Sequence, residues 1–209
     1  MSLKEAHKLH SKVFYPTSIE KVSVKLALSI FSESTANALK YYIENEGRIE
    51  WTGTAWFIEL VIKLWNILNV KTCTKGKRKR NYHMDPVTSP ADWKLEFLKE
   101  FEDFLQTWQD AKTKGLSRET FLATRQTCSA IADCCKHLLG TMDFKFVLLG
   151  HLQSDPIESR FGWLRQMAGG NYFISVRQIV DSDAKIRMMS LLKHSKLSLS
   201  DIDDFIDDI

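Results

Sequence analysis

Five aromatic residues lie on one face of a single predicted helix, and this pattern constrains the fold more than any other feature of the sequence. They are separated by four, four, three and four positions: Trp93, Phe97, Phe101, Phe104 and Trp108. Side chains at such spacings line one side of an α-helix. Ser89 and Pro90 suit its start, with serine as the cap and proline in the first turn. The stripe therefore predicts a long helix with an aromatic face buried in a core.

The same periodicity runs through most of the chain. Residues 54–69 (TAWFIELVIKLWNILN) place five apolar side chains on one face: Phe57, Leu60, Val61, Leu64 and Leu68. Thr17 and Glu20 have the spacing of a capping box, in which hydroxyl and carboxylate bind the first free amides of a helix. Residues 144–149 (FKFVLL) could form a short strand. We therefore predict a mainly α fold, a helical bundle of about six or seven helices with at most one short strand.

Charge is unevenly distributed along the chain. The formal net charge is +3, from 29 basic and 26 acidic residues. Five aspartates lie in residues 200–209 (SDIDDFIDDI), which leaves 21 acids against 29 bases in the rest, a net charge of +8. A basic body suits a polyanionic partner.

Several classes of protein are disfavoured. The sequence has no run of about 18 apolar residues, the length that crosses a bilayer, so we expect no membrane contact. The first residues (MSLKEAHKLHSKVF) lack the apolar segment of a secretory signal. The cysteines show no framework spacing and no C-x-x-C pair, which favours reduced thiols in a nuclear or cytoplasmic protein: Cys73, Cys128, Cys134 and Cys135.

A dense basic run follows the helix of residues 54–69. Residues 71–80 (KTCTKGKRKR) carry six bases, and like charges at this density repel one another and cannot be buried unpaired. We expect an exposed, mobile loop. Its alternative interpretations are a solvated loop, a nuclear localisation signal or a phosphate-binding patch.

Residues 151–171 (HLQSDPIESRFGWLRQMAGGN) combine two carboxylates, a proline and a glycine pair around one helix. Asp155 suits its N-cap, and we expect a buried stripe of Ile157, Phe161 and Leu164. Asp155 and Glu158 have two interpretations. In the local one, Asp155 caps the helix and Glu158 interacts favourably with the helix dipole. In the functional interpretation, both carboxylates face a ligand. Gly162 lies on the same face of the helix as Glu158 and would leave room for that ligand to approach.

This segment resembles the C-terminal signature of P-element-type transposases, the group that includes the THAP-domain transposases. The signature reads Q-D-x-[LI]-E-x-x-F-G-x-x-R followed by G-G-N, and here Ser154 is a one-residue insertion. The matching residues are Gln153, Asp155, Ile157, Glu158, Phe161, Gly162, Arg165 and Gly169-Gly170-Asn171. Residues 22–42 resemble the end of that family's GTP-binding insertion, and WFIELVIKLWNILNVK resembles the segment where its RNase H-like fold resumes.

The resemblance implies a metal-dependent DNA transposase with Mg²⁺ and GTP as cofactors, in which acidic residues hold two metal ions. Glu158 matches the last catalytic, metal-binding glutamate, and Asp155 matches an aspartate associated with guanine recognition. Asn66 stands where the family usually has a metal-binding Asp, and an amide brings no negative charge. We expect DNA contacts from six bases: Lys75, Lys77, Arg78, Lys79, Arg80 and Arg165.

The resemblance also predicts the domain organisation. Residues 1–53 would be the end of the GTP-binding insertion domain, residues 54–195 the helical half of an RNase H-like core, and residues 196–209 an acidic tail. Asn66 and Glu158 should approach each other across two helices. The other acidic residues of such a core would lie before Met1, so we expect this chain alone to be inactive and to bind neither Mg²⁺ nor GTP stably.

Two functions follow as expectations. The first is a fragment, or a degenerate or domesticated relative, of a P-element-type transposase that binds DNA and associates with itself or with a full-length transposase. The second is a helical protein–protein interaction module derived from a transposase.

Overall fold

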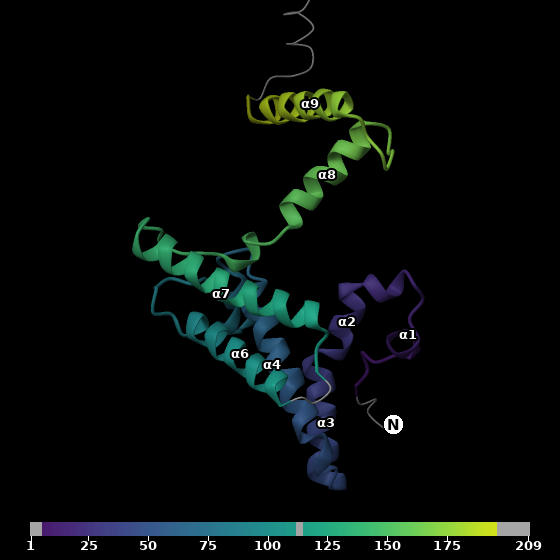
Figure 1. Ribbon diagram of the computed structural model, residues 1–209, viewed down its shortest axis with the longest axis vertical. Coiled ribbons are helices and arrows are strands. Elements are labelled where there is room, and N and C mark those ends of the chain that lie inside the picture. Colours follow the sequence, from purple (N-terminus) through teal and green to yellow (C-terminus); the bar gives the residue numbers. More distant parts are fainter. Residues whose placement is uncertain (1–5, 112–114, 196–209) are drawn as a thin grey trace, which may run out of the picture. The chain divides into compact units, whose positions relative to one another are not determined.

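The computed structural model describes residues 6–111 and 115–195 (Figure 1). The predicted acidic tail therefore lies outside the described residues. The chain divides into two compact units, Met1–Leu152 and Gln153–Ile209.

Helices form nearly all the regular structure of the described residues. The first unit contains α1 (Ser11–Phe14), α2 (Val24–Ile30), α3 (Glu33–Glu46), α4 (Thr52–Leu68), α5 (Lys75–Lys79), α6 (Trp93–Asp110) and α7 (Arg118–Gly140). The second contains α8 (Asp155–Met167) and α9 (Val176–Ser195). Short 3-10 helices are η1 (Glu20–Val22), η2 (Ile49–Trp51), η3 (Tyr82–Met84) and η4 (Leu149–His151). None of these described helices has the length and apolar character needed to span a membrane.

The predicted fold class is confirmed. Residues 144–149 form no strand. Val147 instead exchanges backbone hydrogen bonds with Val87 at 2.8 and 3.0 Å, in an isolated antiparallel bridge. Within the described ranges the structure is otherwise helical.

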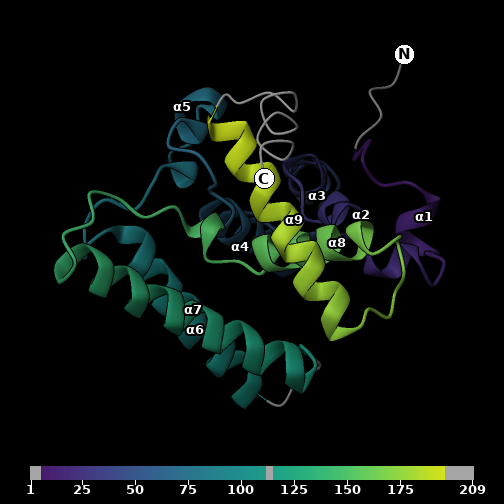
Figure 2. The same cartoon turned by 90° about the horizontal axis from the view of Figure 1, so that it is seen from above.

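The core of the first unit lies where α4, α6 and α7 meet. α6 and α7 run side by side in both views (Figures 1 and 2), and α3 packs along α4. Phe97 and Phe101 of the predicted stripe are buried, and Phe104 and Trp108 pack against the core from its edge. Trp93 is 36% exposed. The Asp92 carboxylate accepts the Lys94 N–H at 3.0 Å, so the cap is Asp92 and not Ser89.

The predicted capping box is present near the start of the chain. The Thr17 N–H and hydroxyl both donate to the Glu20 carboxylate at 2.9 Å. These bonds, with Lys12 nearby, lower the pKa of Glu20 to about 2. The box opens only η1, however, and Ser23 and Ser32 cap α2 and α3 separately.

The basic run is not the loop that we predicted. Residues 75–79 form α5, and Gly76 within it is buried. A Cβ atom at Gly76 would lie 2.0 Å from Asp85 Oδ1, so glycine allows this helix to pack closely against the segment after η3. The Lys75 ammonium donates to the Asn69 carbonyl. The other basic side chains of the run remain exposed, as expected.

The second unit is a pair of helices, and two predictions about α8 are wrong. Asp155 is the first helical residue, and Ser154 occupies the N-cap position. Leu164 is buried, but Ile157 and Phe161 are 61% and 52% exposed. The reason is that α9 packs against the side of α8 that carries Arg160, which bonds to Asp183. Gly169 and Gly170 both have positive φ, which explains the glycine pair after α8.

Candidate functional site

A pocket of about 470 Å³ opens on the first unit between α3, α4 and the segment from Lys79 to His83. The chain turns back towards this pocket at Arg80, which ends α5 in the left-handed backbone region with φ 51°. The Asn81 N–H then donates to the Gly76 carbonyl at 3.0 Å, which fixes the turn. The residues that line the pocket are Glu33, Ala36, Asn37, Glu59, Ile62, Lys63, Asn66, Lys79, Arg80, Asn81, Tyr82 and His83.

Asn66 is the most deeply placed polar side chain of this pocket. It is 8% exposed, and its amide has no hydrogen-bond partner among the described residues. The amide atoms still reach solvent, because among the described residues Arg125 Nε is the buried side-chain nitrogen or oxygen that lacks a partner. Asn66 therefore offers two N–H donors and a carbonyl acceptor to whatever occupies the pocket.

Three cations line the same pocket: Lys63, Lys79 and Arg80. None of them pairs with a carboxylate in the part of the chain that the structure describes. The Lys63 ammonium lies 4.1 Å from the centre of the Phe97 ring and 5.1 Å from that of Trp93.

Two carboxylates also line the pocket. Glu59 forms an ion pair with Lys40, so its charge is already balanced. Glu33 is exposed in the first turn of α3. The cations therefore outnumber the carboxylates, and the pocket is electrostatically suited to an anion.

Aromatic rings form one wall beside the cations. Tyr82 and His83 lie with their ring centres 4.3 Å apart, and both are 5.6 Å from Trp93. The backbone N–H of His83 donates to the Asn81 side-chain oxygen at 3.0 Å. Burial lowers the pKa of His83, and the positive charges of Lys63 and Lys94 lower it further. A neutral imidazole is therefore favoured in this positively charged surrounding.

The predicted carboxylates lie in the second unit, at the start of α8. The Ser154 hydroxyl donates to the Glu158 carboxylate at 2.5 Å, and both side chains are exposed. This contact agrees with the local interpretation of Glu158. A Cβ atom at Gly162 would meet no atom within 4 Å, so the helix itself does not require this glycine. The Arg165 guanidinium lies over the Tyr172 ring at 5.1 Å.

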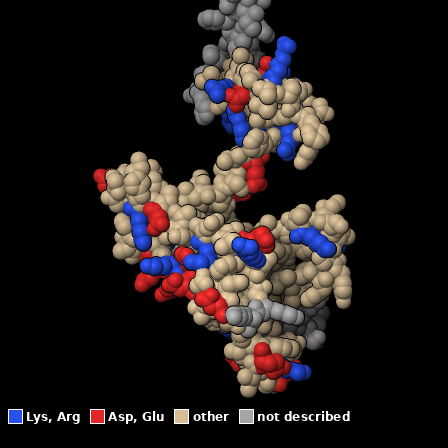
Figure 3. Space-filling view, viewed as in Figure 1, with Lys and Arg blue, Asp and Glu red and all other residues tan. Residues whose placement is uncertain are grey.

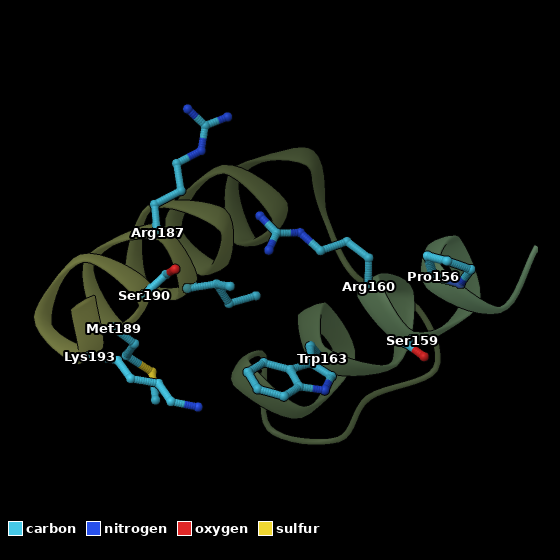
Figure 4. Close-up of a pocket in the computed structure, with 9 residues that line it drawn as sticks. Pro156, Ser159, Arg160, Trp163, Arg187, Met189, Ser190 and Lys193 are labelled. Atoms are coloured by element: carbon cyan, nitrogen blue, oxygen red, sulfur yellow. The ribbon is translucent and has the colours of Figure 1, made fainter. Parts of the chain in front are cut away.

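A second pocket of about 770 Å³ lies between α8 and α9 (Figure 4). Arg160 and Trp163 extend from α8, and Met189 and Lys193 from α9. Asp183 bonds to both Arg160 and Arg187, which lowers the pKa of its carboxyl. This pocket is therefore held by an ionic bridge between its two helices.

The structure brings together only some of the residues that the sequence singles out. Asn66, Lys79 and Arg80 share the first pocket, whereas Lys77 and Arg78 lie outside its lining. Glu158, Asp155 and Arg165 belong to the second unit, so the approach of Asn66 to Glu158 stays a prediction. In the described residues, no three His, Cys, Asp or Glu side chains cluster so that they could hold a metal ion.

Sequence analysis missed Lys63 and His83 as members of the site. Lys63 precedes Asn66 by three positions on the helix predicted for residues 54–69, and that spacing places both on neighbouring faces. His83 had no comparable signal, because its position depends on how α5 and η3 fold back on α4.

Comparison with known proteins connects the first part of the chain to one family. Residues 1–81 match the family described as TNP-like, GTP-binding insertion domain. The match extends past residue 53, where the sequence analysis places a domain boundary, and includes α4. That boundary stays a prediction.

The fold is similar to that of a solved transposase. A chain of the Drosophila P element transposase strand transfer complex aligns with a TM-score of 0.63 and 20% sequence identity. The alignment covers 87% of this chain and 40% of the Drosophila chain. No curated protein sequence matches the chain. The predicted resemblance to P-element-type transposases is confirmed.

Proposed function

We propose that this chain is a DNA-binding relative of P-element-type transposases that does not cut DNA by itself. The observation that carries the proposal is the basic surface of α5 and the residue after it. Lys77, Arg78, Lys79 and Arg80 are exposed, and none forms an ion pair within the described residues. A short helix fixed by Gly76 presents these unpaired charges at one place, as a phosphate backbone requires.

The positive charge of α5 is expected to attract DNA at that site, more than the net charge of the whole chain does. On the face drawn in Figure 3, Lys and Arg side chains are interspersed with Asp and Glu side chains. A mixed surface of this kind gives little net attraction for a polyanion. DNA binding should therefore depend on α5 more strongly than on the overall net charge of +3.

The cofactors of the family fit this chain unequally. The match of residues 1–81 to a GTP-binding insertion domain implies GTP, and Lys63, Lys79 and Arg80 supply cations suited to its phosphates. Asp155 lies in the second unit, and its role in guanine recognition stays an expectation of the resemblance. Mg²⁺ does not fit the described residues, because they contain no cluster of acidic or imidazole ligands and Asn66 is neutral.

The salt dependence of DNA binding tests the proposal. The binding constant K for a fluorescent duplex of arbitrary sequence is measured at several salt concentrations. A plot of log K against log salt concentration should be linear, with a slope of about −0.9 for each phosphate neutralised. The double variant Lys77→Ala/Arg78→Ala should flatten this slope equally for all sequences. These two residues lie outside the pocket lining, and Lys75 is left intact because its ammonium supports the Asn69 carbonyl.

A matched control removes the same charge elsewhere. Lys99 and Lys136 are exposed on α6 and α7, so Lys99→Ala/Lys136→Ala should leave the slope close to that of the unmodified chain. If both double variants change the slope equally, net charge and not α5 determines binding. An unchanged slope in the α5 variant would mean that the DNA contacts lie elsewhere.

The second candidate function is a helical protein–protein interaction module derived from a transposase. It is favoured by the apolar side chains that α8 and α9 leave exposed, among them Ile157, Phe161, Val180 and Leu191. Such side chains mark protein interfaces when they are contiguous. An absence of measurable DNA binding at low salt would favour this function over the first.

The cellular location, the partners and the domain correspondence of the chain are also proposals. We propose a nuclear location, in which the basic run also serves as an import signal. The partners would be DNA and either a second copy of the chain or a full-length transposase. The segment of residues 54–195 would correspond to the helical half of an RNase H-like core.

A further inference from the structure

The pocket between α8 and α9 combines an apolar wall with positive charge. Trp163 of α8 and Met189 of α9 lie on its two sides (Figure 4) and are 52% and 50% exposed. Its described lining contains no Asp or Glu, and its cations are Arg160, Arg187 and Lys193. We propose that residues 201–209 of this same chain dock in the pocket, with their apolar side chains on the wall and their carboxylates towards the cations.

The second unit has little core of its own, so its helices need a cover. Of its described residues, Leu164, Ser182 and Ile186 are the buried ones. Helices in proteins are stabilised mainly by the packing of an apolar face, and a pair with two buried apolar side chains gains little from it. Large exposed apolar side chains that lie together mark a surface that another segment covers.

The sequence of residues 201–209 (DIDDFIDDI) has the pattern of a segment that binds in such a groove. Ile202, Phe205, Ile206 and Ile209 are separated by three, one and three positions. This is the spacing with which a peptide helix lays one apolar face into a hydrophobic groove. The other five residues are aspartates. The segment therefore complements the pocket in both polarity and charge.

Lys193 is the cation of the pocket most available to these aspartates. Arg160 and Arg187 both donate to Asp183, which balances part of their charge. Lys193 forms no ion pair within the part of the chain that the structure describes. It also precedes the end of α9 by two positions, so it is the lining residue nearest in sequence to the proposed segment.

The length of the connection favours docking within one chain. Residues 196–200 join α9 to the segment, and five residues span at most about 18 Å. A short connection gives an effective concentration in the millimolar range, so a site with a Kd of about 0.1 mM would be occupied in about nine chains in ten. A second copy at micromolar concentration would compete poorly with this arrangement.

Two adjacent methionines on α9 report on docking without any label. Met188 and Met189 are 60% and 50% exposed, but Met189 lines the pocket and Met188 does not. An empty pocket predicts similar rates of sulfoxide formation by dilute hydrogen peroxide in the full chain. At the occupancy given above, docking predicts that Met189 is oxidised up to about tenfold more slowly. Fragment-ion mass spectrometry separates the two, which share the tryptic peptide of residues 188–193.

Variants of the segment and of the pocket test the cause of this difference. Phe205→Ser/Ile206→Ser leaves the pocket unchanged and should bring the two oxidation rates together. Lys193→Glu should reduce the difference, because it places a negative charge opposite the aspartates. Lys185→Glu makes the same change at an exposed position of α9 outside the lining, and it should retain the difference.

Four results would overturn the inference. They are similar rates for the two methionines in the unmodified chain, a slow Met189 in Phe205→Ser/Ile206→Ser, equal effects of the two lysine variants, and a difference that grows with protein concentration. The last result would assign the pocket to a segment of a second copy.

The inference does not rest on the proposed DNA binding, and the two can fail separately. Lys77→Ala/Arg78→Ala changes α5 in the first unit, so it should leave the difference between Met188 and Met189 as it is in the unmodified chain.

Discussion

At the scale of single residues, environment decides which cysteine thiols are reactive. Burial raises the pKa of Cys128 and of Cys135 to about 11, with smaller contributions from neighbouring negative groups. Their thiols are therefore protonated at neutral pH, and the thiolate is the form that reacts. Cys73, in contrast, is exposed.

Brief alkylation with iodoacetamide at neutral pH should thus modify Cys73 first. Cys128 and Cys135 should remain unmodified in the folded chain and react after denaturation. Fragment-ion mass spectrometry assigns the modified cysteine, because Cys128 and Cys135 lie in the same tryptic peptide, residues 126–136. Rapid native labelling of Cys128 would contradict the packing of α7 against α6.

His83 gives the stability of the first unit a pH dependence. Its folded-state pKa lies below the ordinary value of 6.5, because of burial first and then of Lys63 and Lys94. Glu33, Glu59, Lys79 and Arg80 line the same pocket. Below about pH 6.5 the unfolded chain takes up a proton that the folded chain resists, so stability should fall as the pH decreases.

His83→Gln removes this titration and should reduce the loss of stability between pH 7.5 and pH 5. The quantity to compare is the change in urea midpoint over that range, in the unmodified chain and in the variant. The other histidines titrate in both proteins and cancel in the difference. A larger loss in the variant would mean that His83 is stabilised as its cation.

At the scale of elements, the sequence predicted the helices well. It predicted poorly which of their faces are buried and which residues of different elements lie together. The aromatic stripe of α6 and the capping box at Thr17 depend on spacing within one segment, and both are present. The burial of Ile157 and Phe161 was wrong because periodicity shows that a face is apolar, not which neighbour covers it. The association of Asn66 with Lys79 and Arg80 needs a tertiary turn that no local pattern encodes.

Gly76 permits the close packing of α5 on which this turn depends. The run of bases suggested a loop, but the glycine within it lets α5 approach Asp85. Gly76→Ala would place a Cβ atom 2.0 Å from Asp85 Oδ1, so the segment must move. Although alanine is the better helix former by about 1 kcal/mol, we expect a net loss of stability of about 1–3 kcal/mol.

Urea denaturation of Gly76→Ala measures this loss directly. Gly53→Ala is the matched control, because a Cβ atom there meets nothing within 4 Å. That control lies in the first turn of α4 and should be neutral or stabilising. Equal stabilities for the two variants would show that α5 does not pack against Asp85.

At the scale of the whole molecule, we propose that the chain binds DNA without cleaving it. The fold is that of part of a P element transposase, and residues 1–81 match its kind of insertion domain. The proposed DNA binding would use the exposed positive charges of α5. Glu158 is the carboxylate that the resemblance assigns to catalysis, and Asn66, which stands where the family usually has a metal-binding Asp, carries no negative charge. Two Mg²⁺ ions require more anionic ligands than this.

Incubation of the purified chain with supercoiled plasmid in Mn²⁺ at low salt, followed by electrophoresis, tests both halves of this claim. We predict that the plasmid is retarded while protein is bound, and that it migrates as intact supercoiled DNA once the protein is removed. Asn66→Asp should not introduce cleavage, because two carboxylates are still too few. Nicked or linear plasmid that forms with the unmodified chain and is lost with Glu158→Ala would contradict the account.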